Sequence, residues 1–222
     1  MATSDPPPAP DAATVDRHRH VVVAGYTSDL ETVQAHLNDL DPVVRQAALS
    51  ALCRLGHCDA QAIRDAFQDP AAQVRSRAAE LASTVDGVTP TPLLSDPDPF
   101  VVEVACFSCG EIDWADNSAP TAELALIATG HDDPLCRESA AAALGAIGDP
   151  AGLDAVLQAC SDRVTVRRRA TLALAAFDDP RADAALHAAL SDKDWQVRQA
   201  AEDLLEVGRV LDAPPDPDAY AD

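Results

Sequence analysis

The pattern Val-Arg-x-x-Ala returns along this chain at intervals of about thirty residues, and it constrains the fold more than any other feature. A segment of that length is too small to bury its own apolar face, so successive copies must stack on one another. The pattern therefore predicts a helical solenoid. Its arginines, the third of which follows a cysteine instead of a valine, are Arg45, Arg75, Arg137, Arg167 and Arg198.

One copy of the pattern is altered. Successive arginines are 30, 62, 30 and 31 positions apart, and the interval of 62 spans two periods. The missing copy lies inside it: an Asp-Pro-rich turn at 96–99 precedes Val101, Ala105 follows, and Val102 occupies the position of the arginine. We therefore count six repeats, of which the third has lost its arginine.

Each repeat is predicted to be a turn, a first helix, a short loop and a second helix. Turns such as 41–42 and 133–134 carry Asp-Pro, where aspartate caps a helix and proline suits its first turn. Val44, Ala48 and Leu52 then fall on one face of the first helix. We expect an all-α fold, a right-handed α-α superhelix of about six helical hairpins.

The two ends depart from this plan. A second helix is predicted over 30–40, with a capping box at 28–31 and a degenerate first helix over 16–26. The last repeat has only a first helix, over 194–207. The expected organisation is a disordered Pro/Ala/Asp-rich leader at 1–14, one solenoid domain at 15–208 and a disordered acidic Pro-rich tail at 209–222.

The middle of the chain is irregular. Prolines between 86 and 96 leave room for about one helical turn, so the second repeat nearly lacks its second helix. An insertion at 114–120 follows the altered third repeat and carries Trp114. A loop tryptophan is a typical interface anchor, but it could equally fold over exposed core. Both interpretations of this segment remain open from the sequence.

Composition excludes several classes of partner. The formal charge of −21 and the sequence pI near 4.3 disfavour nucleic acid and anionic membranes. No apolar run approaches the roughly 20 residues of a spanning helix, and the N-terminus lacks the pattern of a secretory signal. We expect a cytoplasmic protein whose six cysteines are reduced.

The sequence Asp-Pro-x-Val-Arg-x-x-Ala-x-x-Ala-Leu at 41–52, echoed at 133–144 and 162–174, resembles the HEAT repeats, in the short form found in phycobilisome-lyase-type proteins. The resemblance covers about 190 residues and implies a HEAT-like solenoid. HEAT-like deoxyhypusine hydroxylases carry His-Glu dipeptides as iron ligands, and this sequence has none. HEAT-like alkyl-purine DNA glycosylases need a basic concave face, which the charge disfavours.

The repeated arginines have a structural explanation. Each stands at the start of a first helix and can reach the turn aspartate of its own or the neighbouring repeat, so we interpret them as an internal ladder of ion pairs. A cluster at the fifth repeat has a surplus, because Arg163, Arg168 and Arg169 lie outside the ladder. These three could dock a carboxylate-rich partner or a phosphate, or form an ordinary solvated face.

Reactive residues give little support for catalysis. Cys106 and Cys109 form a C-x-x-C, but Cys109 aligns with the core leucines of other repeats, so we interpret the pair as buried. The histidines show no ligand spacing, and no phosphate-binding loop is present. We therefore predict no catalytic residues, no metal and no cofactor.

The predicted function is a non-catalytic scaffold or adaptor, not an enzyme, whose concave face binds a protein partner with a basic surface. Neither nucleic acid nor a membrane is expected as a partner, and the sequence carries no signal for the oligomeric state. The alternative, from the phycobilisome-lyase resemblance, is a bilin or tetrapyrrole lyase or a chaperone-like subunit, with arginines binding propionates. The predicted partner contacts are Trp114, Trp195, Arg163, Arg168 and Arg169.

Overall fold

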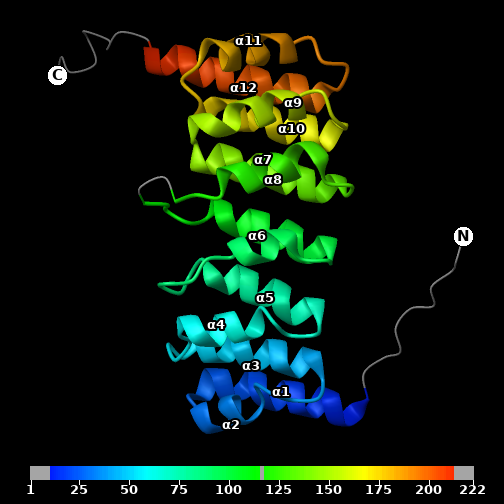
Figure 1. Cartoon of the computed structure of the whole chain (residues 1–222), viewed down its shortest axis with the longest axis vertical. Coiled ribbons are helices and arrows are strands. Elements are labelled where there is room, and N and C mark those ends of the chain that lie inside the picture. Colours follow the sequence, from blue (N-terminus) through cyan, green and yellow to red (C-terminus); the bar gives the residue numbers. More distant parts are fainter. Residues whose placement is uncertain (1–10, 116–117, 213–222) are drawn as a thin grey trace, which may run out of the picture. The chain divides into compact units, whose positions relative to one another are not determined.

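The structure is a computed structural model that describes residues 11–115 and 118–212, with backbone alone for 207–212. Within these residues the chain forms helices and short 3-10 turns and no strand, as expected for the predicted all-α fold. Contacts divide it into two compact units, an N-terminal unit of residues 1–105 and a C-terminal unit of residues 106–222. Each unit is a stack of helical hairpins (Figure 1).

The N-terminal unit consists of two helical layers. The first helices α1, α3 and α5 pack in sequence, and α2 and α4 cover them. A valine from each first helix is fully or almost fully buried, namely Val21, Val44 and Val74. The helices are α1 (Ala12–Thr27), α2 (Leu30–Ala35), α3 (Pro42–Arg54), α4 (Ala60–Ala66), α5 (Ala72–Ala82) and the start of α6 (Pro99–Gly110).

The first hairpin differs from its prediction at both of its caps. Asp11 caps α1 by accepting from the Thr14 amide, so residues 12–14 of the predicted leader are helical. Ser28 is not the cap of the next helix, because it ends α1 with a left-handed φ of 60°. Asp29 takes that role by accepting from the Thr32 amide, and α2 is shorter than predicted.

The second repeat lacks a second α-helix, as predicted. A 3-10 turn at Thr91–Ser95 stands in its place and buries Leu93 and Leu94. Two prolines in the segment, Pro90 and Pro92, remove backbone donors that an α-helix would need. A short turn can still cover the core because two adjacent leucines supply the apolar area.

The C-terminal unit repeats the two-layer plan. In one layer α8, α10 and α12 pack in sequence, and in the other α7, α9 and α11 do so. The last helix extends five residues beyond the helix end predicted at 207, to Asp212, so residues 209–212 of the predicted tail are helical. The remaining helices are α7 (Thr121–Gly130), α8 (Pro134–Ile147), α9 (Leu153–Ala159), α10 (Val164–Ala173), α11 (Pro180–Ala189) and α12 (Trp195–Asp212), with 3-10 turns at Pro150–Gly152 and Leu174–Ala176.

Small residues set the distance between neighbouring first helices. A Cβ at Gly145 of α8 would lie 2.6 Å from the Cβ and 2.7 Å from the Cα of Ala173 in α10. Gly25 of α1 would meet the Cβ of Ala51 in α3 at 2.7 Å. Because buried alanines line these seams, the helices approach more closely than larger side chains would allow.

The structure bears on two expectations from the sequence, the reduced cysteines and the absence of a membrane-spanning helix. Cys53 and Cys58 lie side by side at the end of α3, with Cα atoms 4.4 Å apart, close enough for a disulfide to join them. The reduced state of the cysteines stays a prediction. Of the described helices, none combines the length and apolar character that a membrane crossing requires. The cytoplasmic location and the domain boundaries stay predictions, and the rest of the leader and tail, 1–10 and 213–222, lies outside the described residues.

Candidate functional site

The ladder arginines bridge consecutive turns. Arg45 donates from Nε and Nη2 to both carboxylate oxygens of Asp69, at 2.7 Å each. Its Nη1 donates backwards to the carbonyl oxygens of Asp39 and Leu40. One guanidinium therefore connects the turn before its own helix to the turn of the following repeat. Its planar group of N–H donors matches the two oxygens of a carboxylate.

The same arrangement recurs in both units. The arginine–aspartate pairs have N–O distances of 2.6 to 3.0 Å, and the guanidinium side chains beyond the first pair are 8 to 14% exposed. The first pair was not predicted from the sequence, although its arginine lies 28 positions before Arg45. The pairs are Arg17–Asp39, Arg45–Asp69, Arg75–Asp96, Arg137–Asp162 and Arg167–Asp192. Arg198 donates to the Asp192 carbonyl oxygen.

Each ladder aspartate also orders its own turn. Asp96, for example, accepts from the backbone amide of Asp98 and from Arg75. Burial alone would raise the pKa of Asp96, but Arg75 and the Asp98 amide hold that pKa below its ordinary value. The carboxylate is thus the form that the folded chain stabilises.

We expect the ladder to lose its contribution in acid. Because the folded pKa of Asp96 is below 3.8, its stabilisation is fully present above that pH and is lost as pH falls through the folded pKa. At neutral pH the unmodified protein should have a larger free energy of unfolding than the Arg75→Ala variant, as measured by urea titration. The difference between the two proteins should shrink below about pH 4. Comparing the two proteins cancels changes in overall charge repulsion. A difference independent of pH would contradict this assignment.

At the third repeat both members of the arginine–aspartate pair are replaced. Val102, at the arginine position, is 1% exposed and packs as core. Six residues before Arg137, where other repeats place the aspartate, stands His131, whose Nδ1 accepts from the Asp133 amide at 3.1 Å. The histidine thus preserves the turn without requiring an arginine.

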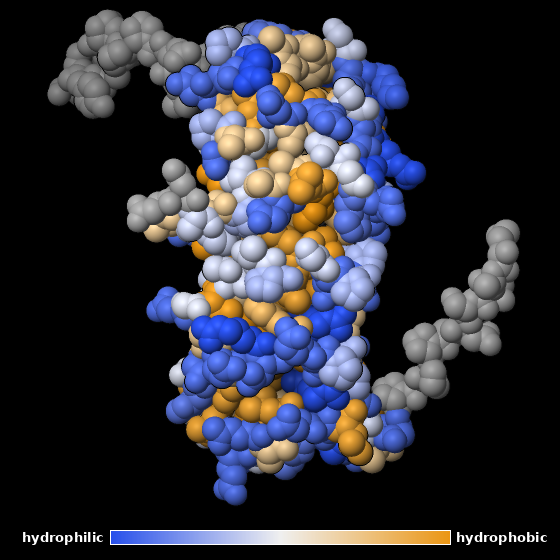
Figure 2. Space-filling view, viewed as in Figure 1, coloured by the Kyte–Doolittle hydropathy of each residue, from blue (hydrophilic) through white to orange (hydrophobic). Residues whose placement is uncertain are grey.

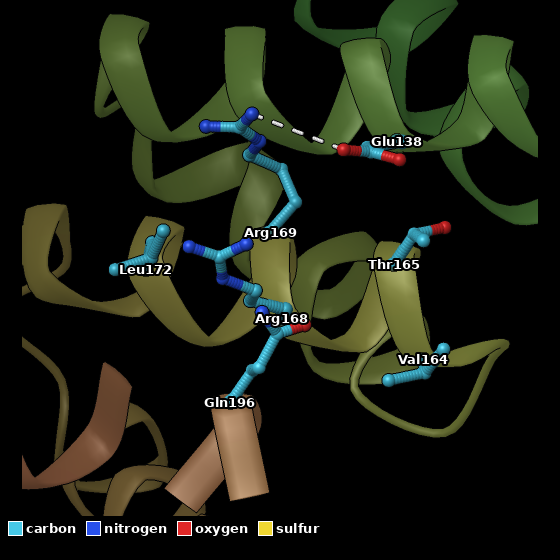
Figure 3. Close-up of a pocket in the computed structure, with 7 residues that line it drawn as sticks. All are labelled: Glu138, Val164, Thr165, Arg168, Arg169, Leu172 and Gln196. Atoms are coloured by element: carbon cyan, nitrogen blue, oxygen red, sulfur yellow. Dashed lines mark ion pairs between the residues drawn. The ribbon is translucent and has the colours of Figure 1, made fainter. Parts of the chain in front are cut away.

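The surplus arginines border a small pocket over α8, α10 and α12. Its volume is about 120 Å³, and it is lined by Arg168, Arg169, Glu138, Leu172 and Gln196, together with Val164 and Thr165. In Figure 3, Arg168 and Arg169 project from α10, and Arg169 reaches toward Glu138 while Gln196 enters from α12. The predicted cluster is thereby divided, because Arg163 does not line the pocket.

The two tryptophans differ in their surroundings. Trp195 is 64% exposed at the start of α12, one repeat after the position of Val164. Trp114 is half-buried, and its indole N–H donates to the carbonyl oxygen of Cys109 at 2.8 Å. Trp114 therefore caps the end of α6 while its ring lines a groove.

That groove, the Trp114 groove, has a volume of about 540 Å³. It is formed by 110–114 at the end of α6, Ala119, and 146–150 at the end of α8. Glu111 and Asp113 are exposed there, and both helices end in it, so their terminal carbonyl groups add negative potential. The groove is suited to a cation.

The C-x-x-C pair lies in the core. Cys106 and Cys109 are both fully buried in α6 and are not joined by a disulfide. Burial, with a smaller effect of Glu123, raises the pKa of Cys109 to about 12. Its thiol is therefore protonated at neutral pH, unlike a reactive cysteine. In the described part of the chain, no three His, Cys, Asp or Glu side chains form a group that could hold a metal ion.

Comparison with known families accounts for the repeats. A model described as HEAT repeats matches residues 88–171 and 121–206, more than half of the chain. The chain is a HEAT-repeat protein. A second model, a HEAT repeat associated with sister chromatid cohesion, matches residues 30–52 of this HEAT-repeat protein. The predicted HEAT class and helical fold are confirmed, and the phycobilisome-lyase subtype stays a prediction.

Comparison with individual proteins is less specific. No functionally curated protein matches the sequence significantly. Among solved structures, human deoxyhypusine hydroxylase in complex with glycerol is similar, at 21% identity and a TM-score of 0.46, covering 90% of this chain and 81% of that one. The human protein is an enzyme, and this finding contradicts the prediction that the present chain is not one. At this identity and TM-score, the likeness assigns no activity to the present chain.

Proposed function

We propose that this HEAT-repeat protein is a scaffold or adaptor that binds a protein partner with a basic surface, and that the Trp114 groove contacts that partner. The observation that carries the proposal is the convergence of Glu111, Asp113 and two helix C-termini on a groove bordered by an aromatic ring. A lysine or arginine side chain would find carboxylates for its charge and the Trp114 ring for a cation–π contact.

The charge distribution supports the same partner. Five arginines are held in ladder pairs, so they do little to neutralise carboxylates elsewhere on a chain of net charge −21. In Figure 2 hydrophilic residues cover much of the visible face of each unit, and hydrophobic patches lie among them. An acidic surface of this kind attracts basic proteins from a distance and repels acidic ones.

Affinity purification from the native cell tests the proposal. The variant Glu111→Gln with Asp113→Asn removes two groove charges that make no hydrogen bond to other described side chains, so its fold should be kept. We expect recovery of the partner to fall about five- to tenfold, since each exposed charge pair contributes up to about 1 kcal/mol.

The matched control neutralises two exposed carboxylates away from the groove, Glu202→Gln with Glu206→Gln on α12. It carries the same change in net charge and should leave recovery unchanged. If partner recovery fell equally with both variants, the loss would be due to the overall charge and not to the groove. Undiminished recovery with the groove variant would exclude the groove as the contact.

A further inference from the structure

The pocket over α8, α10 and α12 has the opposite charge to the Trp114 groove. Among carboxylates of the described residues, only Glu138 pairs with a pocket arginine, and it lies 3.8 Å from Nη2 of Arg169. That guanidinium side chain is 47% exposed, so the pair is long, hydrated and weak. Arg168 carries a second exposed guanidinium into the same pocket. The pocket is locally cationic in a strongly acidic chain.

Apolar side chains stand beside these charges. Val164 and Leu172, both on α10, are 36% and 37% exposed and line the pocket. Trp195, exposed at the start of α12, precedes Gln196, which also lines it. Apolar and cationic groups on one small surface fit a ligand that presents an anion next to an aliphatic side chain.

The dimensions limit what can bind. A volume of about 120 Å³ suits the end of a side chain and is below the roughly 300 Å³ at which small-molecule sites begin. A more open hollow of about 390 Å³ shares Arg169 and Leu172 with it. Guanidinium groups bind carboxylates and phosphates through paired hydrogen bonds. A polyphosphate chain would meet repulsion from the surrounding acidic surface along its whole length, whereas a peptide segment with a single carboxylate at the pocket would meet much less.

We propose that this pocket binds an acidic peptide segment of a second protein, with a Glu or Asp carboxylate on Arg168 and Arg169 and a neighbouring aliphatic side chain on Val164 and Leu172. The incoming carboxylate replaces Glu138 as the partner of Arg169. This site lies apart from the Trp114 groove and takes a ligand of opposite charge, so it does not depend on the function proposed above.

A defined probe tests the site directly. The peptide acetyl-Gly-Leu-Glu-Leu-Gly-amide is titrated into the isotope-labelled full chain, and amide and arginine Nε–H shifts are followed by NMR. At physiological ionic strength the Debye length is about 8 Å, so distant carboxylates are screened while the pocket arginines remain in contact. We expect saturable shifts in residues 164–172 and at Gln196, with a dissociation constant of about 1 mM.

Three changes and one control test which groups make the contact. Glutamine in place of the peptide glutamate should weaken binding about tenfold, as should Arg168→Gln. Glu138→Gln should strengthen binding about threefold because it removes the competing carboxylate. Arg19→Gln, an equal charge change at an exposed arginine of the N-terminal unit, should leave binding unchanged.

Several results would overturn the proposal. They are equal binding of the glutamate and glutamine peptides, undiminished binding by Arg168→Gln, or no saturable shift at up to about 10 mM peptide. If only a peptide with phosphoserine in place of glutamate bound, the ligand of the pocket would be a phosphate and not a carboxylate. None of these results bears on partner recovery through the Trp114 groove, so the two proposals fail separately.

Discussion

Replacement of Arg167 by alanine is expected to lower the free energy of unfolding of the C-terminal unit by about 3 kcal/mol. The guanidinium side chain is 8% exposed, and it donates to both carboxylate oxygens of Asp192 and to the Asp162 carbonyl oxygen. Its loss leaves a partly buried carboxylate without its counterion, and this costs more than the pair itself contributes. Urea denaturation followed by circular dichroism measures the change.

The neighbouring Arg168 provides the control. It lies on the same helix and has the same side chain, but it is exposed and outside the ladder, so Arg168→Ala should change stability by less than about 0.5 kcal/mol. A double-mutant cycle with Asp192→Ala should give a coupling of about 2 kcal/mol. A cycle with no coupling would mean that the effect of Arg167 comes from its backbone contacts alone.

Gly145→Ala is expected to destabilise the C-terminal unit by about 2 kcal/mol, although alanine is the better helix former by about 1 kcal/mol. The new methyl group would lie 2.6 Å from the Cβ and 2.7 Å from the Cα of Ala173, so α8 and α10 must separate. Gly145→Val should cost more, because a larger side chain requires a larger displacement.

Gly130 distinguishes packing from helix propensity. It ends α7, and no atom lies within 4 Å of the place where its Cβ would be. Gly130→Ala should therefore leave stability unchanged or raise it by up to about 1 kcal/mol. Thermal or urea unfolding should show a loss of stability for Gly145→Ala and no loss for Gly130→Ala. Stabilisation by Gly145→Ala would show that the helices can separate without loss of packing.

Much of the fold could be predicted from the sequence because the repeat is a local signal. Val44 and Val74 recur with their arginines, and each stands at the start of a helix whose apolar face follows from the 3.6-residue period. The truncated second repeat could also be predicted, since prolines between 86 and 96 restrict the backbone whatever the tertiary context. Cap residues were less predictable, because Ser28 and Asp29 are both good caps and the chain path decides between them.

The candidate sites could be predicted only in part, because they combine residues from different repeats. The sequence indicated that Arg168 and Arg169 are surplus, but not that Glu138, about thirty positions earlier, competes for Arg169. Trp114 was recognisable as a loop aromatic, whereas the groove depends on α6 and α8 ending side by side. That Cys53 and Cys58 lie close enough to pair could be seen only from their separation in space, with Cα atoms 4.4 Å apart.

The ladder also determines where the length of this chain can change during evolution. From Arg45 onward, each repeat arginine closes a short ring by donating to a carbonyl oxygen five or six residues before it, as Arg45 and Arg167 do. An insertion inside that ring would separate the guanidinium from this carbonyl oxygen. The two irregularities in length, the shortened second helix at 91–95 and the insertion at 114–120, both lie outside such rings. New loops, and with them new binding specificities, can therefore be added between the rings without disturbing the repeats that carry them.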